Sequence, residues 1–138
     1  MALSWIHEDT PVWDADKAAL VGGAPKGTFA DLPSLGALAP GEWFRVEDAG
    51  RVVGYGWMDV TWGDAEVLLV VAPDAQGRGV GRFILDRLER EAAARGVNYM
   101  LNEVRASHPD KAAVTAWLER QGFRGTGDGV LRRQVASK

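Results

Sequence analysis

The sequence predicts an α+β domain, an α/β mixed sheet flanked by helices, and three observations support this fold class. Strand-like runs with short turns fill residues 43–71, an amphipathic helical pattern follows at 80–96, and another strand-like run covers 97–104. A chain that returns from strand through helix to strand pairs those strands in parallel through a right-handed crossover. The length of 138 residues suits a single domain, 1-138, with one core.

The first forty residues carry weaker signals. Leu3 to Ile6 has the pattern of a short strand, and Val12 to Leu20 has a weak helical pattern. Residues 22–41 are rich in glycine, proline and small side chains around a few apolar ones. This composition predicts a loop that encloses a short helix.

Three consecutive runs then predict an antiparallel meander, because only short turns separate them. They are Trp43 to Glu47, Arg51 to Trp62 and Ala65 to Val71. The third run contains a continuously apolar stretch at 67–71, which is typical of a strand covered on both faces. We therefore expect it to be central in the sheet.

The C-terminal half continues with better-defined elements. Apolar residues recur at helical spacing from Val80 until Gly96, a suitable stop. A second helix places Val114, Trp117 and Leu118 on one face and ends near Gly122. Residues 123–124 and 130–135 predict a last hairpin.

The junction between the apolar strand and the first of these helices has the composition of an anion site. It reads Gln76-Gly77-Arg78-Gly79-Val80-Gly81, followed by Arg82. Glycine allows backbone N–H groups to converge on a phosphate, and the helix N-terminus adds partial positive charge. A Walker loop is excluded because Gly81 is followed by Arg82 rather than by lysine and a hydroxyl residue. The dinucleotide pattern G-x-G-x-x-G is absent as well.

The strand end Val71-Ala72-Pro73 and the glycine loop together resemble the signature of the GNAT superfamily of acyl-CoA-dependent N-acyltransferases. A second landmark, Trp117-Leu118-Glu119-Arg120-Gln121-Gly122-Phe123, resembles the helix of that family that closes on Gly-Phe. The resemblance implies a GNAT-like fold: a central, mostly antiparallel sheet with one splayed parallel strand pair. It also implies acetyl-CoA, or another short acyl-CoA, as co-substrate, with the pantetheine arm between the fourth and fifth strands.

By this resemblance, backbone groups of the fourth strand would pair with pantetheine, and the glycine loop would hold the pyrophosphate. Lys111 stands where the family often has an asparagine, and it would instead reach a cofactor phosphate. The implied residues are Leu69, Val70, Val71, Gln76, Gly77, Arg78, Gly79, Val80, Gly81, Arg82 and Lys111.

Acyl transfer to an amine needs a group that accepts a proton, because free amines have pKa values near ~10. Glu66 is the first candidate base, one residue from the expected position of the family's glutamate, and Glu103 and His108 are alternatives. Each of the three also fits a structural role at a strand end or helix cap. The family's tyrosine acid is matched here by Leu118, so that role is vacant.

The acceptor is expected to be a primary amine of a small molecule or peptide, receiving the acyl group directly in a ternary complex. Trp13, Trp57 and Trp62 are candidates for the acceptor pocket, although strand tryptophans are also common in cores. Residues 1–69 carry 11 acids and 4 bases, whereas 70–138 carry 8 acids and 12 bases, which would suit a cationic acceptor and an anionic cofactor. The alternative is a catalytically impaired CoA-binding sensor or interaction module.

Composition excludes other classes. The absence of cysteine excludes disulfides and thiolate metal sites, and no metal is expected. The net charge of −3 argues against nucleic acid as a partner. No membrane association is expected, because the chain shows neither a secretory signal nor a membrane-spanning run, and the default location is cytoplasmic. The sequence leaves a homodimer open.

Overall fold

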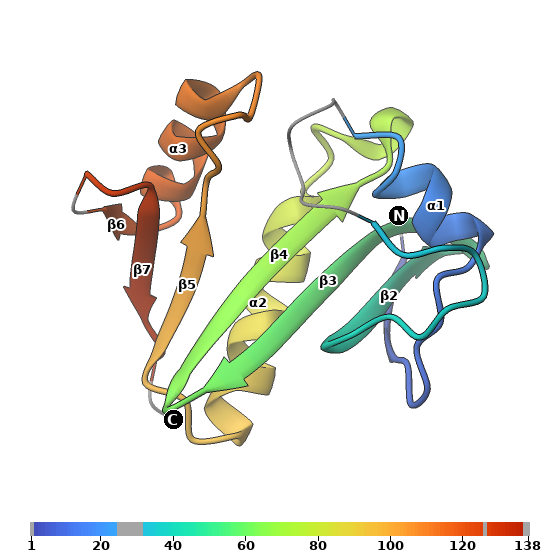
Figure 1. Cartoon of the computed structure of the whole chain (residues 1–138), viewed down its shortest axis with the longest axis horizontal. Coiled ribbons are helices and arrows are strands. Elements are labelled where there is room, and N and C mark those ends of the chain that lie inside the picture. The colour runs from blue at the N-terminus through green and yellow to red at the C-terminus, as the bar shows by residue number, and fades with distance from the viewer. Residues whose placement is uncertain (1, 25–31, 126, 137–138) are drawn as a thin grey trace.

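A computed structural model of the chain describes residues 2–24, 32–125 and 127–136. Within these residues, seven strands form one mixed sheet in the order β1-β2-β3-β4-β5-β7-β6, with helices on both sides (Figure 1). The elements are β1 (Leu3–His7), α1 (Ala15–Leu20), β2 (Glu42–Asp48), β3 (Arg51–Thr61), β4 (Asp64–Val71), η1 (Pro73–Ala75), α2 (Val80–Ala94), β5 (Tyr99–Glu103), α3 (Lys111–Arg120), β6 (Arg124–Gly125) and β7 (Val130–Gln134).

Most of the predicted elements are confirmed. The meander of β2, β3 and β4 is antiparallel, and the parallel pair is β4 with β5. The weak helical pattern yields only the short helix α1, which begins at Ala15 after its N-cap Asp14. The short helix expected within 22–41 is absent from residues 32–41, and residues 25–31 lie outside the described part of the chain.

The parallel pair is short. β4 pairs with β5 only through Asp64, Ala65 and Glu66, whose partners are Tyr99, Met100 and Leu101. Beyond these residues the two strands diverge, so that β4 and β5 form the two arms of a V in Figure 1. On its other edge β4 stays paired with β3 as far as Val71.

The main hydrophobic core lies between the sheet and α2. Ile84 and Leu88 of α2 are fully buried against β3, where Gly54 and Gly56 leave room for them. A Cβ on Gly56 would lie 3.0 Å from side-chain atoms of both Ile84 and Trp5, so glycine permits this close helix packing. The same core includes Leu118 of α3.

A second, smaller core lies on the opposite face of the sheet, beneath α1. It contains the aromatic residues Trp13, Trp43 and Tyr55. Lys17 is fully buried among them, with its Nζ 2.6 Å from a Glu8 carboxylate oxygen and 5.2 Å from the Trp43 ring centre. Pairing with carboxylates and aromatic faces offsets the cost of removing this charge from water.

None of the helices in the described residues has the length and apolar character needed to cross a membrane.

Candidate active site

The glycine loop ends in an open helix N-terminus. Gly77 and Gly79 have φ values of +78° and +85°, and a Cβ built on either would meet no atom within 4 Å. The first helical bond of α2 runs from the Phe83 N–H to the Gly79 carbonyl at 3.0 Å. The three preceding N–H groups, at 80–82, therefore have no acceptor within the helix. Together with the helix dipole they form a site suited to an anion.

The acid of this loop is already neutralised. Asp74 is hydrogen-bonded to the guanidinium of Arg51, which lowers the pKa of Asp74 below its ordinary value. A carboxylate held by arginine repels an incoming phosphate less than a free one does.

A cleft of about 910 Å³ runs from this loop between the diverging strands. Its walls come from the end of α1, from β4, from the glycine loop and start of α2, from the end of β5, and from α3. Figure 1 shows the opening of the V between β4 on one side and β5 with α3 on the other. Arg82, Arg105 and Arg120 are among the lining residues, which favours an anionic ligand.

One buried side chain closes the narrow end of this cleft. Asn102 of β5 donates from its Nδ2 to the Val67 carbonyl oxygen of β4 at 2.8 Å. This hydrogen bond bridges the strands just beyond their last paired residues, Glu66 and Leu101. Asn102 therefore sets the point from which the two strands diverge.

The free edge of β4 follows from strand alternation. The Ala72 N–H bonds to the Val53 carbonyl of β3, so the backbone groups of Val70 also point toward β3. Those of Leu69 and Val71 point into the cleft, beyond the last residue that pairs with β5. The Val71 carbonyl accepts a 3.3 Å hydrogen bond from Nε2 of Gln76. The remaining groups form a strand edge that an extended ligand could pair with.

Most of the residues implied as cofactor contacts line the cleft. Those that do are Leu69, Val70, Val71, Gln76, Gly77, Gly79, Val80, Gly81 and Arg82. Arg78 and Lys111 are exposed and do not line it.

The three candidate bases occupy different places. Glu103 and His108 line the cleft, whereas Glu66 lies outside it. His108 accepts a 2.9 Å hydrogen bond at Nδ1 from the Asp110 N–H. A neutral imidazole that accepts at Nδ1 carries its proton on Nε2, so this ring is set to donate rather than to accept.

Glu66 belongs to a group of three carboxylates, Asp59, Glu66 and Glu103, which we call the acidic strip. Asp59 is the β3 partner of Glu66, and strand alternation places all three on the sheet face opposite α2. Burial, then repulsion from Glu103 and Asp59, raises the pKa of Glu66 above its ordinary value. The strip is therefore electrostatically suited to a cation.

Next to the acidic strip, on the same face, lies a cavity of about 210 Å³ that we call the aromatic pocket. Its walls include Trp13, Trp43, Tyr55, Trp57, Leu68 and Val70. The indole N–H groups of Trp43 and Trp57 both donate to the Pro40 carbonyl, at 3.0 and 2.8 Å. These bonds hold the segment before β2 against the sheet.

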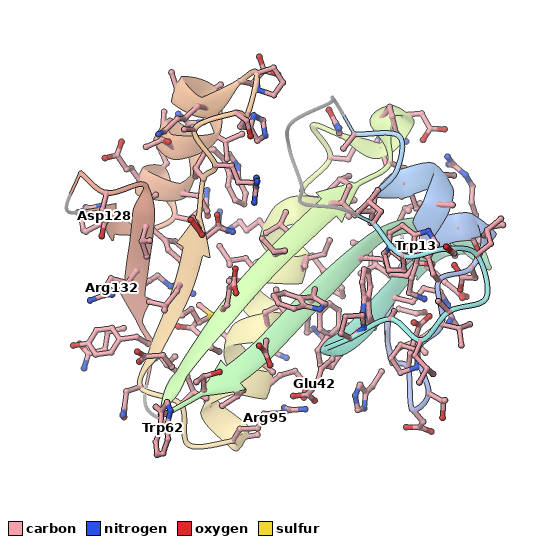
Figure 2. The ribbon with its side chains drawn as sticks, in the orientation of Figure 1. Trp13, Glu42, Trp62, Arg95, Asp128 and Arg132 are labelled. Carbon is pink, nitrogen blue, oxygen red and sulfur yellow. The ribbon has the colours of Figure 1, made fainter. Side chains whose placement is uncertain are left out.

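The structure brings Trp13 and Trp57 together in this pocket but not Trp62. Trp62 is 97% exposed in the turn between β3 and β4 and lines neither cavity. Figure 2 shows Trp62 at one end of the molecule, far from Trp13 beside α1. The same view labels Glu42 and Arg95, whose ion pair of 2.6 Å joins β2 to the end of α2.

Sequence reasoning missed Asn102, Asp59 and Trp43. A signal existed for Asn102. It lies two residues after Met100, on the same buried face of the strand, and a buried amide needs a hydrogen-bond partner. Asp59 and Trp43 become identifiable only with the strand register, which places them opposite Glu66 and Trp57.

The position of the family's tyrosine holds a buried leucine. Leu118 is 2% exposed and belongs to the main core, although it also borders the cleft. Tyr55 lies in the second core and Tyr99 at the first residue of β5, so neither replaces it. In the described ranges, His, Asp and Glu side chains form no group of three or more that could hold a metal ion.

The sequence of residues 39–125 matches the family described as the acetyltransferase (GNAT) domain. A curated relative, the [ribosomal protein bS18]-alanine N-acetyltransferase of Escherichia coli strain K12, is 35% identical over 81 residues. These residues make up 58% of this chain and 53% of that protein, so the chain spans about half the length of the relative it matches.

Solved structures show the same fold. The ribosomal-protein-S18-alanine N-acetyltransferase from Escherichia coli aligns with a TM-score of 0.65 and 21% identity, over 99% of this chain and 96% of that one. A GNAT-family protein from Desulfovibrio desulfuricans aligns with a TM-score of 0.71 and 18% identity, over 98% of this chain and 100% of that one. A phosphinothricin acetyltransferase from Sinorhizobium meliloti, solved in complex with acetyl-CoA, aligns with a TM-score of 0.56 and 20% identity, over 70% of this chain and 62% of that one. With its mixed sheet, its splayed parallel strands and its matching sequence, this chain belongs to the GNAT acetyltransferase family.

Proposed function

We propose that this protein transfers an acetyl or other short acyl group from acyl-CoA to a primary amine of a small molecule or peptide. Transfer would be direct, within a ternary complex of protein, acyl-CoA and amine. The observation that carries the proposal is the cleft that joins an anion site at the start of α2 to the free edge of β4. A ligand with a pyrophosphate at one end and an extended amide arm at the other matches both features.

The glycine loop fits the pyrophosphate. With Gly77 and Gly79 in left-handed conformations that leave open space, the loop offers backbone N–H groups without steric hindrance. Arg82 lines the same part of the cleft and supplies a charge-assisted contact. The Leu69 and Val71 backbone groups would pair with the amides of the pantetheine arm, in the way that an added strand pairs with a sheet edge.

We propose Glu103 as the group that accepts the proton from the amine. It lines the cleft near the Asn102 bridge, and the amine must lose a proton before or as its nitrogen bonds to the thioester carbonyl carbon. The carbon–sulfur bond then breaks, and CoA leaves as thiolate or thiol. His108, with its proton on Nε2, would act as a donor at the same end of the cleft.

One observation supports a second candidate function. The buried Leu118 cannot donate a proton to the leaving thiolate, which suits a CoA-binding sensor without transfer activity. A thiol with a pKa near ~8.5 is nonetheless a tolerable leaving group without an acid, so transfer stays the first proposal. Release of free thiol from acetyl-CoA in the presence of amines separates the two functions, because a sensor binds CoA without releasing thiol.

The cofactor site is tested by calorimetry with CoA on Gly79→Asp. The substitution places a carboxylate at the anion site, so binding should weaken by about a hundredfold or more. Gly127→Asp is the matched control, because Gly127 also has a left-handed φ of +92° with open space around its Cβ position. Equal CoA affinity of the two variants would remove the pyrophosphate from this loop. Failure of CoA to bind the unmodified protein below millimolar concentration would refute the donor altogether.

Glu103→Gln tests the proton acceptor. Its kcat should fall about a hundredfold while CoA affinity is retained, since only the basic oxygen is lost. Glu119→Gln, at an exposed position of α3, is the control and should keep full activity. If Glu66→Gln loses activity and Glu103→Gln does not, Glu66 is the base.

A further inference from the structure

The acidic strip and the aromatic pocket are neighbours on one face of the sheet, because both contain cross-strand pairs of β3 and β4. Trp57 and Leu68 are partners across β3 and β4, and Asp59 and Glu66 are partners two residues further along. Two residues along a strand span about 7 Å. The carboxylates and the apolar walls are thus separated by a distance that a single small ligand can bridge.

We infer that the acceptor is an amine that carries a bulky apolar or aromatic group, which the aromatic pocket binds while the ammonium lies against the acidic strip. This inference rests on the proposed function and names the substrate class of the same site. The shared chemistry is a cationic nitrogen about 5–7 Å from a ring or branched chain. Both a free arylalkylamine and the N-terminal residue of a peptide provide it.

The size of the aromatic pocket suits a ring. Its volume of about 210 Å³ exceeds the ~150 Å³ that suffices for benzene in an apolar cavity. Leu68, Leu69 and Val70 line both this pocket and the cleft, so an occupant of the pocket lies next to the free edge of β4. An amine held there reaches the acyl group from the face opposite α2.

The chemistry of the walls disfavours a polar group. The indole N–H groups of Trp43 and Trp57 are both engaged by the Pro40 carbonyl, so neither is left for a ligand. A hydroxyl or a second ammonium placed among these rings would lose its water without a replacement partner. Tyr55 adds no accessible polar group to the walls, because its hydroxyl is buried.

Charge selects the other end of the ligand. Asp59 is exposed and Glu66 half-buried, and burial, then repulsion from Glu103 and Asp59, raises the pKa of Glu66. A cation placed among them relieves that repulsion. Carboxylated amines are disfavoured for the same reason.

The experiment compares primary amines with and without a bulky apolar group as acceptors, with acetyl-CoA as donor. Phenethylamine and 2-cyclohexylethylamine represent the apolar class, and ethylamine and ethanolamine lack a bulky apolar group. The dipeptide amides Phe-Gly and Gly-Gly test the peptide source in the same way. We expect kcat/KM to favour the apolar member of each comparison by about tenfold or more.

Three variants assign this preference to the pocket. Trp57→Ala removes one wall, and Leu32→Asn places an amide at the partly exposed rim. Both should reduce the preference for phenethylamine over ethylamine about tenfold, mainly through KM. Trp62→Ala makes the same chemical change as Trp57→Ala outside the pocket and should leave the preference unchanged.

The outcomes separate this inference from the proposed function. Turnover without preference for apolar amines, or a preference that survives both pocket variants, overturns the inference and leaves the function intact. Absence of turnover with every amine counts against the function. In that case, calorimetry of phenethylamine with the CoA-bound protein decides the pocket: binding lost in Trp57→Ala but not in Trp62→Ala supports it, and no binding to the unmodified protein overturns it.

Discussion

Glu66 is half-buried and faces two other carboxylates, and this environment couples its charge to folding. Burial, followed by repulsion from Glu103 and Asp59, raises its pKa above the ordinary value of 4.5. The folded protein therefore holds the Glu66 proton more tightly than the unfolded chain does. Ionisation of Glu66 costs stability at neutral pH, and the cost disappears once the pH falls below about 4.5, where both states are protonated.

Glu66→Gln should accordingly stabilise the protein at pH 7, because glutamine resembles the neutral acid. The advantage should shrink as the pH is lowered toward 4 and vanish there. Urea unfolding at a series of pH values measures this difference. Glu119→Gln, on an exposed part of α3, should show no such pH-dependent gain. A variant that is less stable than the unmodified protein at pH 7 would show that Glu66 makes a favourable contact that outweighs the repulsion.

The candidate residues could be predicted from the sequence more easily than their roles. Glu103 lies on β5 beyond the last residue that pairs with β4 and borders the cleft, whereas Glu66 lies in the paired part of β4 and does not. The role of His108 depends on a bond to the Asp110 backbone, which a sequence pattern does not specify. Residue type predicts chemistry, but register and local hydrogen bonds decide which atom is available.

At the scale of elements, the predictions succeeded where the pattern was long and periodic. The spacing of apolar residues is enough to predict α2 and the meander. The pattern extends over 15 residues in α2 and over 8 residues in β4, the last strand of the meander. The short helix expected within 22–41 does not lie at 32–41, where the order comes from tertiary contacts. The Pro40 carbonyl is bound by two indoles from β2 and β3, and Gly41 adopts a left-handed φ of +85°. The composition of the segment alone does not predict such contacts.

The hydrogen bond from Asn102 to Val67, which joins β5 to β4, can be tested by a single substitution. Asn102→Asp keeps the shape of the side chain but replaces the donor with a carboxylate against the Val67 carbonyl oxygen. We expect a loss of about 2 kcal/mol or more in the free energy of unfolding at neutral pH. The loss should shrink as the pH falls, since a protonated acid can donate to Val67 again. Denaturant unfolding at neutral and acidic pH provides the measurement.

Asn98→Asp is the matched control for that change, because Asn98 is exposed and lies just before the same strand. It should alter stability by less than about 0.5 kcal/mol. Similar losses in both variants would show that the added charge, rather than the lost hydrogen bond, is responsible.

At the scale of the whole molecule, the site is assembled from segments distant in sequence. The cleft joins the end of α1 to α3, and the aromatic pocket joins Trp13 to Val70. The charge asymmetry predicted from the two halves is only partly realised. Arg82, Arg105 and Arg120 of the C-terminal half line the cleft, but the acidic strip takes Glu103 from that half as well. The net charges of the two halves do not predict this mixing, because the crossover places β5, from the C-terminal half, beside β4.

The splayed architecture makes a prediction for hydrogen exchange. The amides of Leu69 and Val71 point into the cleft beyond the paired part of β5, so they should exchange rapidly in the free protein. The Val70 amide points toward β3 and should exchange slowly. Saturation with CoA should slow exchange at Leu69 and Val71 by about tenfold or more, because the pantetheine arm completes the strand edge.

3′-Phosphoadenosine 5′-diphosphate separates strand pairing from general stabilisation, because it carries the 3′-phosphate and the pyrophosphate of CoA without the pantetheine arm. It should slow amides that exchange through global unfolding, in proportion to its affinity, but leave Leu69 and Val71 fast. Amide exchange followed by NMR resolves the three positions. Slow exchange of Leu69 and Val71 without ligand would mean that the β4 edge is already paired. Equal protection by both ligands would place the arm of CoA elsewhere, and with it the route by which the acyl group reaches the acidic strip.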